Sequence, residues 1–234
     1  MNSRTVRRTA LLAAVATLAA CSPDSLTGPD VRSARVVKPE PRNPILFVHG
    51  WNSSGAIWGT MMDRFIADGY PAGELFSWSY NTSQSNATTA QQLATRVSEI
   101  LSATGAAKVD IITHSMGALS ARYYIKNLGG GSTVDEFVSL GGPNHGTYTA
   151  AFCGQVSCVE MRPNSAFLTA LNKKDETPGR TIRYATWWSA CDQVINPQQS
   201  TILSGATNTQ TACIEHSALY QDPAVYSAVR AWVQ

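Results

Sequence analysis

A serine in a setting typical of an enzymatic nucleophile lies near the middle of the chain. Ser115 stands in the stretch Thr113-His114-Ser115-Met116-Gly117, between a short apolar run and an amphipathic one. A G-x-S-x-G motif between a strand and a helix presents its serine on a tight turn, where small residues let the two backbones approach. Gly117 meets that need, whereas Thr113 replaces the first glycine. Since a serine before a helix is also a common N-cap, the motif alone leaves both interpretations open.

A serine nucleophile needs a general base, and two histidines follow Ser115 in the chain, His145 and His216. His145 directly follows the fourth predicted strand, which is the wrong place for the base in a sheet of this order. His216 lies between the last predicted strand and the last predicted helix. We therefore expect His216 to be the base.

The acid that orients such a histidine is expected after another strand. Three aspartates lie between Ser115 and His216. Asp135 precedes a predicted strand and falls at the opposite edge of the sheet, and Asp175 belongs to a charged, solvated run. Asp192 follows the fifth predicted strand. The predicted triad is therefore Ser115, Asp192 and His216, in which the carboxylate orients the imidazole and stabilises its protonated form.

Acyl transfer through a serine also requires backbone N–H groups that bind the oxyanion of the tetrahedral intermediate. The N–H of Met116, at the start of a helix, supplies one. The second is expected from a loop after an earlier strand, and Trp51 follows the predicted first strand as required. The His49 side chain in the same loop is expected to be buried and hydrogen-bonded at a strand end, without a catalytic role.

These residues need a framework, and the apolar patterning predicts one in which strands and helices alternate. Short apolar runs predict strands at Ile45 to His49, Leu75 to Tyr80, Val109 to Thr113, Phe137 to Leu140, Ile182 to Trp188 and Thr211 to Ile214. Amphipathic runs predict helices at Trp58 to Asp68, Ala87 to Ala103, Gly117 to Leu128, Ser165 to Leu171 and Pro223 to Val233. This order predicts an α/β fold with a mostly parallel six-stranded sheet, helices on both faces, and ligand sites at the carboxyl ends of the strands.

Composition excludes several classes of protein. The chain has 234 residues, of which 44% are hydrophobic and 15% charged, so it is neither disordered nor a coiled coil. Without Arg4, Arg7 and Arg8, 15 basic residues stand against 16 acidic ones, and the electrostatic footprint of a nucleic-acid-binding protein is missing. The cysteines and histidines do not have the spacing of a metal site, so we expect neither a metal nor another cofactor.

The first 42 residues predict export and a lipid anchor. An arginine-rich start precedes the apolar run Ala10 to Ala20, which is too short to span a bilayer, so residues 1–20 are interpreted as a signal peptide. The run ends in Leu18-Ala19-Ala20-Cys21, which is similar to a bacterial lipobox, whose cysteine receives a diacylglyceryl group. Residues 21–42 are then an anchored, proline-rich tether, and residues 43–234 form one catalytic domain at the cell envelope. The alternative is an ordinary secretory signal with Cys21 unmodified.

Four further cysteines suit an oxidising compartment, and sequence alone allows three ways to pair them. Cys153 and Cys158 are five residues apart with a glycine between them, which permits a small disulfide-closed loop. Pairing Cys191 with Cys213 would join the loop of the predicted acid to that of the predicted base. We expect these two pairs, and four buried free thiols are the alternative.

Five stretches of the chain together resemble the small secreted bacterial triacylglycerol lipases and esterases of the minimal α/β-hydrolase type, the class 2 lipases. They are Ile-Leu-Phe-Val-His-Gly-Trp, Val-Asp-Ile-Ile-Thr-His-Ser-Met-Gly, Leu-Gly-Gly-Pro-Asn-His-Gly, Ser-Ala-Cys-Asp-Gln-Val-Ile-Asn-Pro and Glu-His-Ser-Ala-Leu. The resemblance covers nearly all of residues 43–234. It implies a short six-stranded sheet without a large lid domain, metal-independent hydrolysis of carboxylic esters, and the same triad and oxyanion residues. The segment 146–180 is longer than in the smallest members.

The leading hypothesis is a monomeric serine hydrolase of lipids or other apolar acyl esters, with tryptophans around the pocket. Trp78, Trp187 and Trp188 fall at strand ends and are expected to form the walls of that pocket. A polyester hydrolase or an acyltransferase would use the same triad. A protein of another class, a surface-binding protein without activity, would keep the fold alone. The intact order of the three triad residues favours an enzyme.

Overall fold

A computed structural model describes residues 42–234, so the predicted signal peptide and Cys21, with nearly all of the predicted tether, lie outside the described residues. Within this range six strands form one sheet in the order β2-β1-β3-β4-β5-β6, and every neighbouring pair is parallel. The strands are β1 (Ile45–Val48), β2 (Leu75–Trp78), β3 (Val109–His114), β4 (Val134–Leu140), β5 (Arg183–Trp188) and β6 (Thr207–Gln210). The predicted six-stranded parallel sheet is confirmed.

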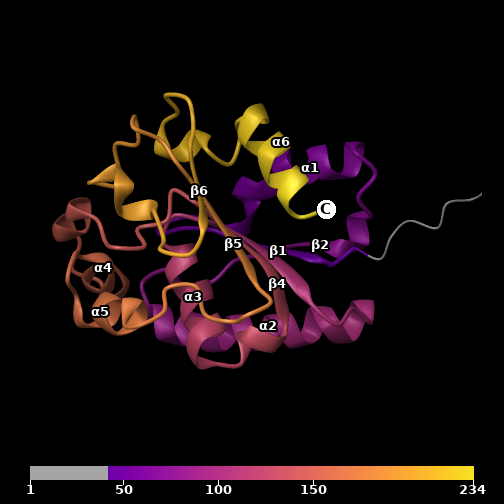
Figure 1. Cartoon of the computed structure of the whole chain (residues 1–234), viewed down its shortest axis with the longest axis horizontal. Coiled ribbons are helices and arrows are strands. Elements are labelled where there is room, and N and C mark those ends of the chain that lie inside the picture. The colour runs from indigo at the N-terminus through magenta and orange to yellow at the C-terminus, as the bar shows by residue number, and fades with distance from the viewer. Residues whose placement is uncertain (1–41) are drawn as a thin grey trace, which may run out of the picture. The chain divides into compact units, whose positions relative to one another are not determined.

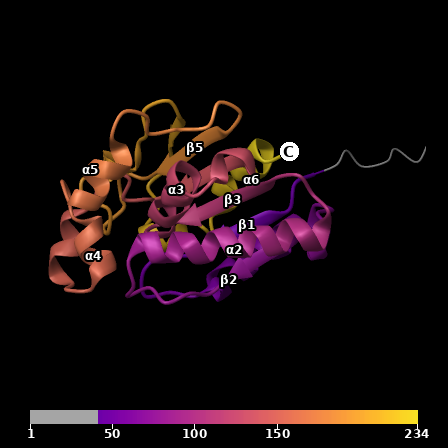
Figure 2. The ribbon, with the colours of Figure 1, turned by 90° about the horizontal axis from the view of Figure 1, so that it is seen from below.

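Helices cover both faces of the sheet (Figure 1). On one face lie α1 (Gly59–Ala67) and α6 (Pro223–Trp232), and on the other α2 (Asn86–Thr104) and α3 (Gly117–Asn127). Figure 2 shows α2 running along its face of the sheet. Successive strand residues point to opposite faces, and therefore the apolar side chains of β1 divide between the two cores. A strand that is covered on both faces has the continuous apolar run that made it recognisable in the sequence.

The helix boundaries follow ordinary capping chemistry. The Ser85 hydroxyl accepts the N–H of Ala87 at the start of α2, and Gly105 ends that helix in the left-handed conformation. At α6 the Asp222 carboxylate accepts the N–H groups of Ala224 and Val225, with Pro223 in the first turn. These local signals explain why both helices lie within a residue or so of their predicted limits.

The connection between β4 and β5 contains the segment 146–180. It contains a 3-10 turn at Tyr148–Phe152 and the short helices α4 (Val156–Met161) and α5 (Ala166–Asn172). Met116 and Leu119 of the α3 region pack with side chains of α4 and α5 to form a third apolar cluster. In Figure 1 α4 and α5 lie together at one end of the sheet. Among residues 42–234, no helix combines the length and apolar character needed to cross a bilayer.

The structure differs most from the prediction at one strand and one helix. The last strand lies at Thr207–Gln210, four residues before the predicted one, because β6 is an edge strand whose four residues are all exposed and polar. It has no apolar pattern, and the prediction took the next apolar residues in its place. The helix α4 was not predicted, because it is only six residues long and its valines face solvent, while Ser157, Cys158 and Met161 are buried.

Candidate active site

Ser115 stands at a sharp turn between β3 and α3. Its backbone adopts a φ of +55°, a conformation that is unusual for a residue other than glycine and costs about 1–3 kcal/mol. The turn is held by its surroundings, since the Ser115 N–H donates to the carbonyl of Leu140 at the end of β4, at 2.9 Å. Gly117 lies against β1, where a Cβ would come within 2.6 Å of the Val48 carbonyl oxygen. The strand, turn and helix predicted around Ser115 are therefore all present.

Asp192 and His216 form a buried hydrogen-bonded pair. The Nδ1–H of His216 donates to Oδ2 of Asp192 at 2.7 Å. The other carboxylate oxygen accepts the backbone N–H groups of Val194 and Ile195, both at 2.8 Å. Both carboxylate oxygens of this buried acid therefore accept hydrogen bonds. The Nε2 atom of His216 is left for another partner. Gly141, with a φ of +56°, packs so closely that a Cβ would lie 3.2 Å from both Asp192 Oδ2 and His216 Nδ1.

His114 holds the histidine loop against the serine turn, a contact that the sequence analysis missed. Because a carbonyl oxygen only accepts, the Nε2–H of His114 donates to the backbone oxygen of His216, at 3.0 Å. The two rings are 4.5 Å apart between centroids. Burial, and secondarily the neighbouring His216, holds the pKa of His114 well below its ordinary value, so the ring is neutral. Its position directly before Ser115 was the available signal.

The loop after β1 places Gly50 against the serine. A Cβ at Gly50 would lie 2.6 Å from Ser115 Cβ and 3.2 Å from its Oγ, so only glycine fits without displacement. His49 is fully buried, donates from Nδ1 to the Gly50 carbonyl at 2.8 Å and stacks on Tyr80. Burial lowers the pKa of His49. His49 therefore shapes the loop, while Trp51 emerges at its exposed end.

A pocket of about 390 Å³ contains both Ser115 and His216. Trp51 and His114 also line it, and so do residues from the β4–β5 connection and from the loop that follows Asp192. The latter two groups are Thr147, Thr149, Ala150, Cys153, Cys158, Met161, Val194 and Ile195. Among residues 42–234, no Asp, Glu, Lys or Arg side chain lines this pocket. The arrangement suits an uncharged ligand.

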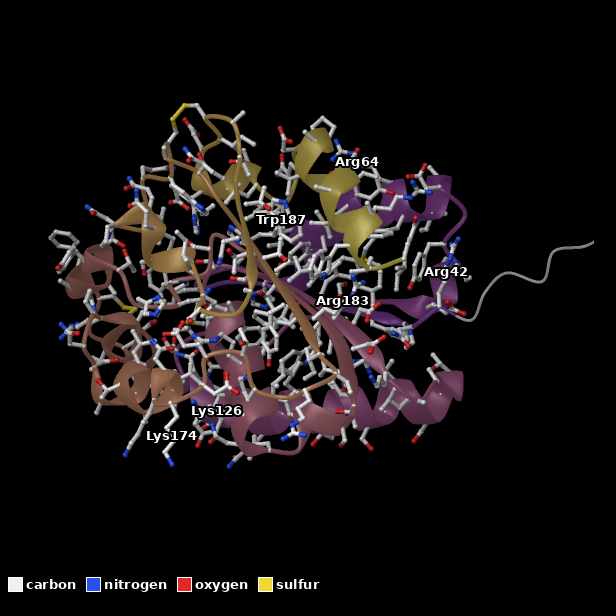
Figure 3. All side chains as sticks on the ribbon, viewed as in Figure 1. Arg42, Arg64, Lys126, Lys174, Arg183 and Trp187 are labelled. Carbon is white, nitrogen blue, oxygen red and sulfur yellow. A yellow bond between two sulfur atoms is a disulfide. The ribbon has the colours of Figure 1, made fainter. Side chains whose placement is uncertain are left out.

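The prediction that Trp78, Trp187 and Trp188 form the walls of this pocket is wrong. Trp187 points from β5 into the core beneath α6 and approaches Trp232 edge-on. Figure 3 labels Trp187 near α6. Trp78 packs against Tyr80, 4.8 Å between ring centroids, on the opposite face of the sheet. Trp188 is half-buried beside β6. A place at a strand end does not determine which face a side chain takes, and none of these three residues lines the pocket that contains Ser115.

Both predicted disulfides are present in the structure. Cys153 and Cys158 close a small loop beside the pocket, with Cα atoms 5.7 Å apart, and Cys191 and Cys213 are joined at 5.0 Å. The second bond links the segment that carries Asp192 to the segment that carries His216. Ser189 reinforces the link, since its hydroxyl oxygen accepts the N–H groups of Cys191 and Ile214 at 3.1 and 2.9 Å. No pattern in the sequence indicated this buried serine.

The sequence matches the family model of the class 2 lipases over residues 42–226. The chain belongs to the class 2 lipase family. Its members are ester hydrolases of the lipase and esterase type, and residues 42–226 cover nearly the whole of the described domain.

Solved structures of other lipases share the fold of this class 2 lipase. The mature lipase BlEst2 from Bacillus licheniformis superposes with a TM-score of 0.74 at 18% sequence identity, covering 85% of this chain and 95% of that one. Lipase B from Aspergillus fumigatus gives a TM-score of 0.70 at 16% identity, over 82% of this chain and 53% of that one. Phospholipase PlaB from Legionella pneumophila gives 0.66 at 13% identity, over 83% and 60%. The fold is that of the α/β-hydrolases.

Proposed function

We propose that this class 2 lipase hydrolyses carboxylic esters through a covalent acyl-enzyme formed on Ser115. The observation that carries the proposal is the convergence in one pocket of a serine on a strained turn and a histidine whose Nδ1–H is held by a buried carboxylate. In the proposed reaction Ser115 Oγ attacks the ester carbonyl while His216 Nε2 takes its proton. Asp192 stabilises the imidazolium that results.

The remaining steps follow from the same groups. We assign the backbone N–H groups of Trp51 and Met116 to the oxyanion of the tetrahedral intermediate, because the tight contact of Gly50 with Ser115 brings the loop of Trp51 to the reacting carbonyl. The imidazolium returns its proton to the departing alkoxide, which leaves as the alcohol. Water then attacks the acyl-enzyme, giving up a proton to His216, and the carboxylic acid is released as the serine regains its proton.

The substrate that fits this pocket best is an uncharged ester with an apolar acyl chain. Tyr220, Met161 and Ile195 present apolar surface to the cavity, and its volume suits an acyl chain of moderate length. The absence of lysine and arginine from the lining, among the described residues, leaves an anionic substrate without an ionic partner. We propose a neutral acylglycerol as the physiological class, ahead of small water-soluble esters.

A fluorophosphonate probe tests the nucleophile directly. We expect the wild type to be labelled on Ser115, with labelling abolished in Ser115→Ala at an unchanged circular dichroism spectrum. A series of p-nitrophenyl esters of increasing chain length then ranks the acyl preference. Substantial kcat surviving in Ser115→Ala, or labelling at another residue, would show the assignment to be wrong.

We also propose that the enzyme is exported and anchored at the cell envelope through Cys21. The support is the lipobox-like Leu18-Ala19-Ala20-Cys21 and the proline-rich stretch that follows. Two or more acyl chains suffice for stable attachment, since each buried methylene contributes about 0.8 kcal/mol. Intact mass of the membrane fraction tests this, because an unmodified Cys21 in a wholly soluble protein would contradict it.

A further inference from the structure

The turn after β1 carries one of the two N–H groups proposed to bind the oxyanion. Within residues 42–234 the backbone N–H of Trp51 donates to no other residue, whereas that of its neighbour Asn52 does. Asn52 adopts a φ of +50°, a conformation that residues other than glycine adopt rarely. Both residues are exposed, so burial does not hold this turn. Its shape therefore depends on contacts made with other segments.

A direct contact reaches this turn from the connection between β4 and β5. The indole N–H of Trp51 donates to Gln155 Oε1 at 2.6 Å, across 104 positions of the sequence. Gln155 directly precedes α4 and lies within residues 153–158, the disulfide loop, which the Cys153–Cys158 bond closes. One residue thus carries both the proposed oxyanion donor and the side chain that the disulfide loop binds. A contact to the ring restricts the rotation of the backbone that carries the ring.

A second route joins the same two segments through Thr82. The Ser157 hydroxyl donates to the Thr82 carbonyl at 2.6 Å, and Ser157 is fully buried. Thr82 Oγ1 in turn accepts the backbone N–H of Asn52 at 3.2 Å. The disulfide loop therefore contacts the turn after β1 both directly and through one intermediate residue.

The disulfide loop is held in place by other parts of the molecule. Its two cysteines line the pocket, and Cys158 is buried in the apolar cluster that also contains Met116, the second proposed oxyanion residue. Arg162 donates to the Cys153 carbonyl at 2.9 Å. None of these contacts involves Trp51. The disulfide loop is therefore a support whose position does not depend on the turn that it binds.

We propose that the disulfide loop positions the backbone N–H of Trp51 for the oxyanion, with Gln155 as the positioning residue. The inference rests on the proposed function, since this N–H has that role only if Ser115 forms a tetrahedral intermediate. Oxyanion donors act because they are fixed before the charge develops, and a misplacement of about 1 Å can lower a rate about a hundredfold. Gln155 does not line the pocket, so its effect on the rate passes through Trp51.

A double-mutant cycle tests the contact between the two side chains. Gln155→Ala removes the acceptor and leaves the start of α4 unchanged, because this side chain makes no cap hydrogen bond. Trp51→Phe removes the indole N–H and keeps the backbone N–H. We expect Gln155→Ala to lower kcat on p-nitrophenyl butyrate about three- to tenfold with KM nearly unchanged. Trp51→Phe should lower kcat to a similar degree, and the double variant should lose no more than either single variant.

The matched control is Gln91→Ala, which removes an exposed glutamine from α2, and its kcat should equal that of the wild type. The matching thionoester, in which sulfur replaces the carbonyl oxygen, reports on the oxyanion itself. Sulfur accepts hydrogen bonds weakly, so intact oxyanion donors favour the oxygen ester. The ratio of kcat/KM for the oxygen ester to that for the thionoester should fall about three- to tenfold in Gln155→Ala and stay at the wild-type value in Gln91→Ala.

Several results would overturn the proposal. An unchanged ratio in Gln155→Ala would show that the contact does not act on the oxyanion, and a rise in KM for both esters would assign it to the shape of the pocket. Full additivity in the cycle, or an equal fall of the ratio in Gln91→Ala, would also refute it. With an active wild type, these results leave the proposed function intact. A wild type that hydrolyses neither ester would refute the proposed function and this inference with it.

Discussion

Replacing Asp110 with asparagine is expected to flatten the pH dependence of the free energy of unfolding. Asp110 is almost fully buried near the amino end of β3 and accepts the side-chain amide of Asn43 and the backbone N–H of Glu136, both at 3.2 Å. Burial, followed by the nearby charge of Glu136, raises the pKa of Asp110 to about 8. Glu136 is itself buried, which raises its pKa to about 7, although Arg183 opposes that shift.

The size and sign follow from proton linkage. The folded protein holds the Asp110 proton up to about pH 8, whereas the unfolded chain releases it near its ordinary pKa of 3.8. Between these values the folded state binds more protons, so this contribution to stability is greatest at acid pH, falls as the pH rises from about 4 to about 8, and is constant above that. A difference of about 4 pKa units corresponds to about 5 kcal/mol. An asparagine keeps the acceptor oxygen for both hydrogen bonds and does not ionise, which removes this loss.

Urea unfolding at pH 5, 7 and 9, with the disulfides intact, measures the effect. We expect the wild type to lose several kcal/mol between pH 5 and 9 and Asp110→Asn to lose much less. The matched control is Asp135→Asn, at the same edge of the sheet, where the acid is partly exposed and paired with Lys108 at 2.6 Å. A wild type whose stability is constant or rises over this range, or an Asp110→Asn variant with the wild-type slope, would refute the reasoning.

Three further predictions concern the site and its anchor. Gly50→Ala should lower kcat/KM at least about a hundredfold with an unchanged circular dichroism spectrum, because the new Cβ would lie 2.6 Å from the Cβ of Ser115, the proposed nucleophile. The control is Gly73→Ala, where a Cβ meets nothing within 4 Å, and its kcat/KM should be unchanged. The double variant Cys191→Ala with Cys213→Ala should lose about 3 kcal/mol of unfolding free energy in urea, and its kcat should fall at temperatures where it is still folded. Full activity in that variant would contradict a role of the disulfide in positioning Asp192 and His216. Cys21→Ser should move the protein from the membrane to the soluble fraction or block its processing, as immunoblots of cell fractions would show, and an unchanged distribution would speak against the anchor.

Elements with strong apolar patterns were predictable from the sequence. The central strands are buried on both faces, so their runs of apolar residues indicate strands without knowledge of the partners. The helices α2 and α6 carry both an apolar face and a cap. The edge strand β6 has neither signal, since its pairing with β5 is made by the backbone and its side chains are exposed. Its position depends on a neighbour distant in sequence.

The residues of the candidate site also fall into those that the sequence could predict and those that it could not. Chain order and topology were sufficient to predict that Ser115, Asp192 and His216 lie in one region, because the carboxyl ends of parallel strands meet at one edge. They were insufficient for the pocket walls, since the direction of Trp187 depends on which face α6 covers. They also missed His114, whose contact with the backbone of His216 joins residues far apart in the sequence.

The Cys191–Cys213 bond has a consequence for an enzyme exposed to proteases. The segment between these cysteines includes β6 and its exposed flanks, where a protease has access to the backbone. One cut there divides the chain into a large fragment with Ser115 and Asp192 and a small one with His216 and α6. The disulfide keeps the two fragments covalently joined, so their association remains an intramolecular event with a high effective concentration. A nicked molecule can therefore keep Asp192 and His216 together.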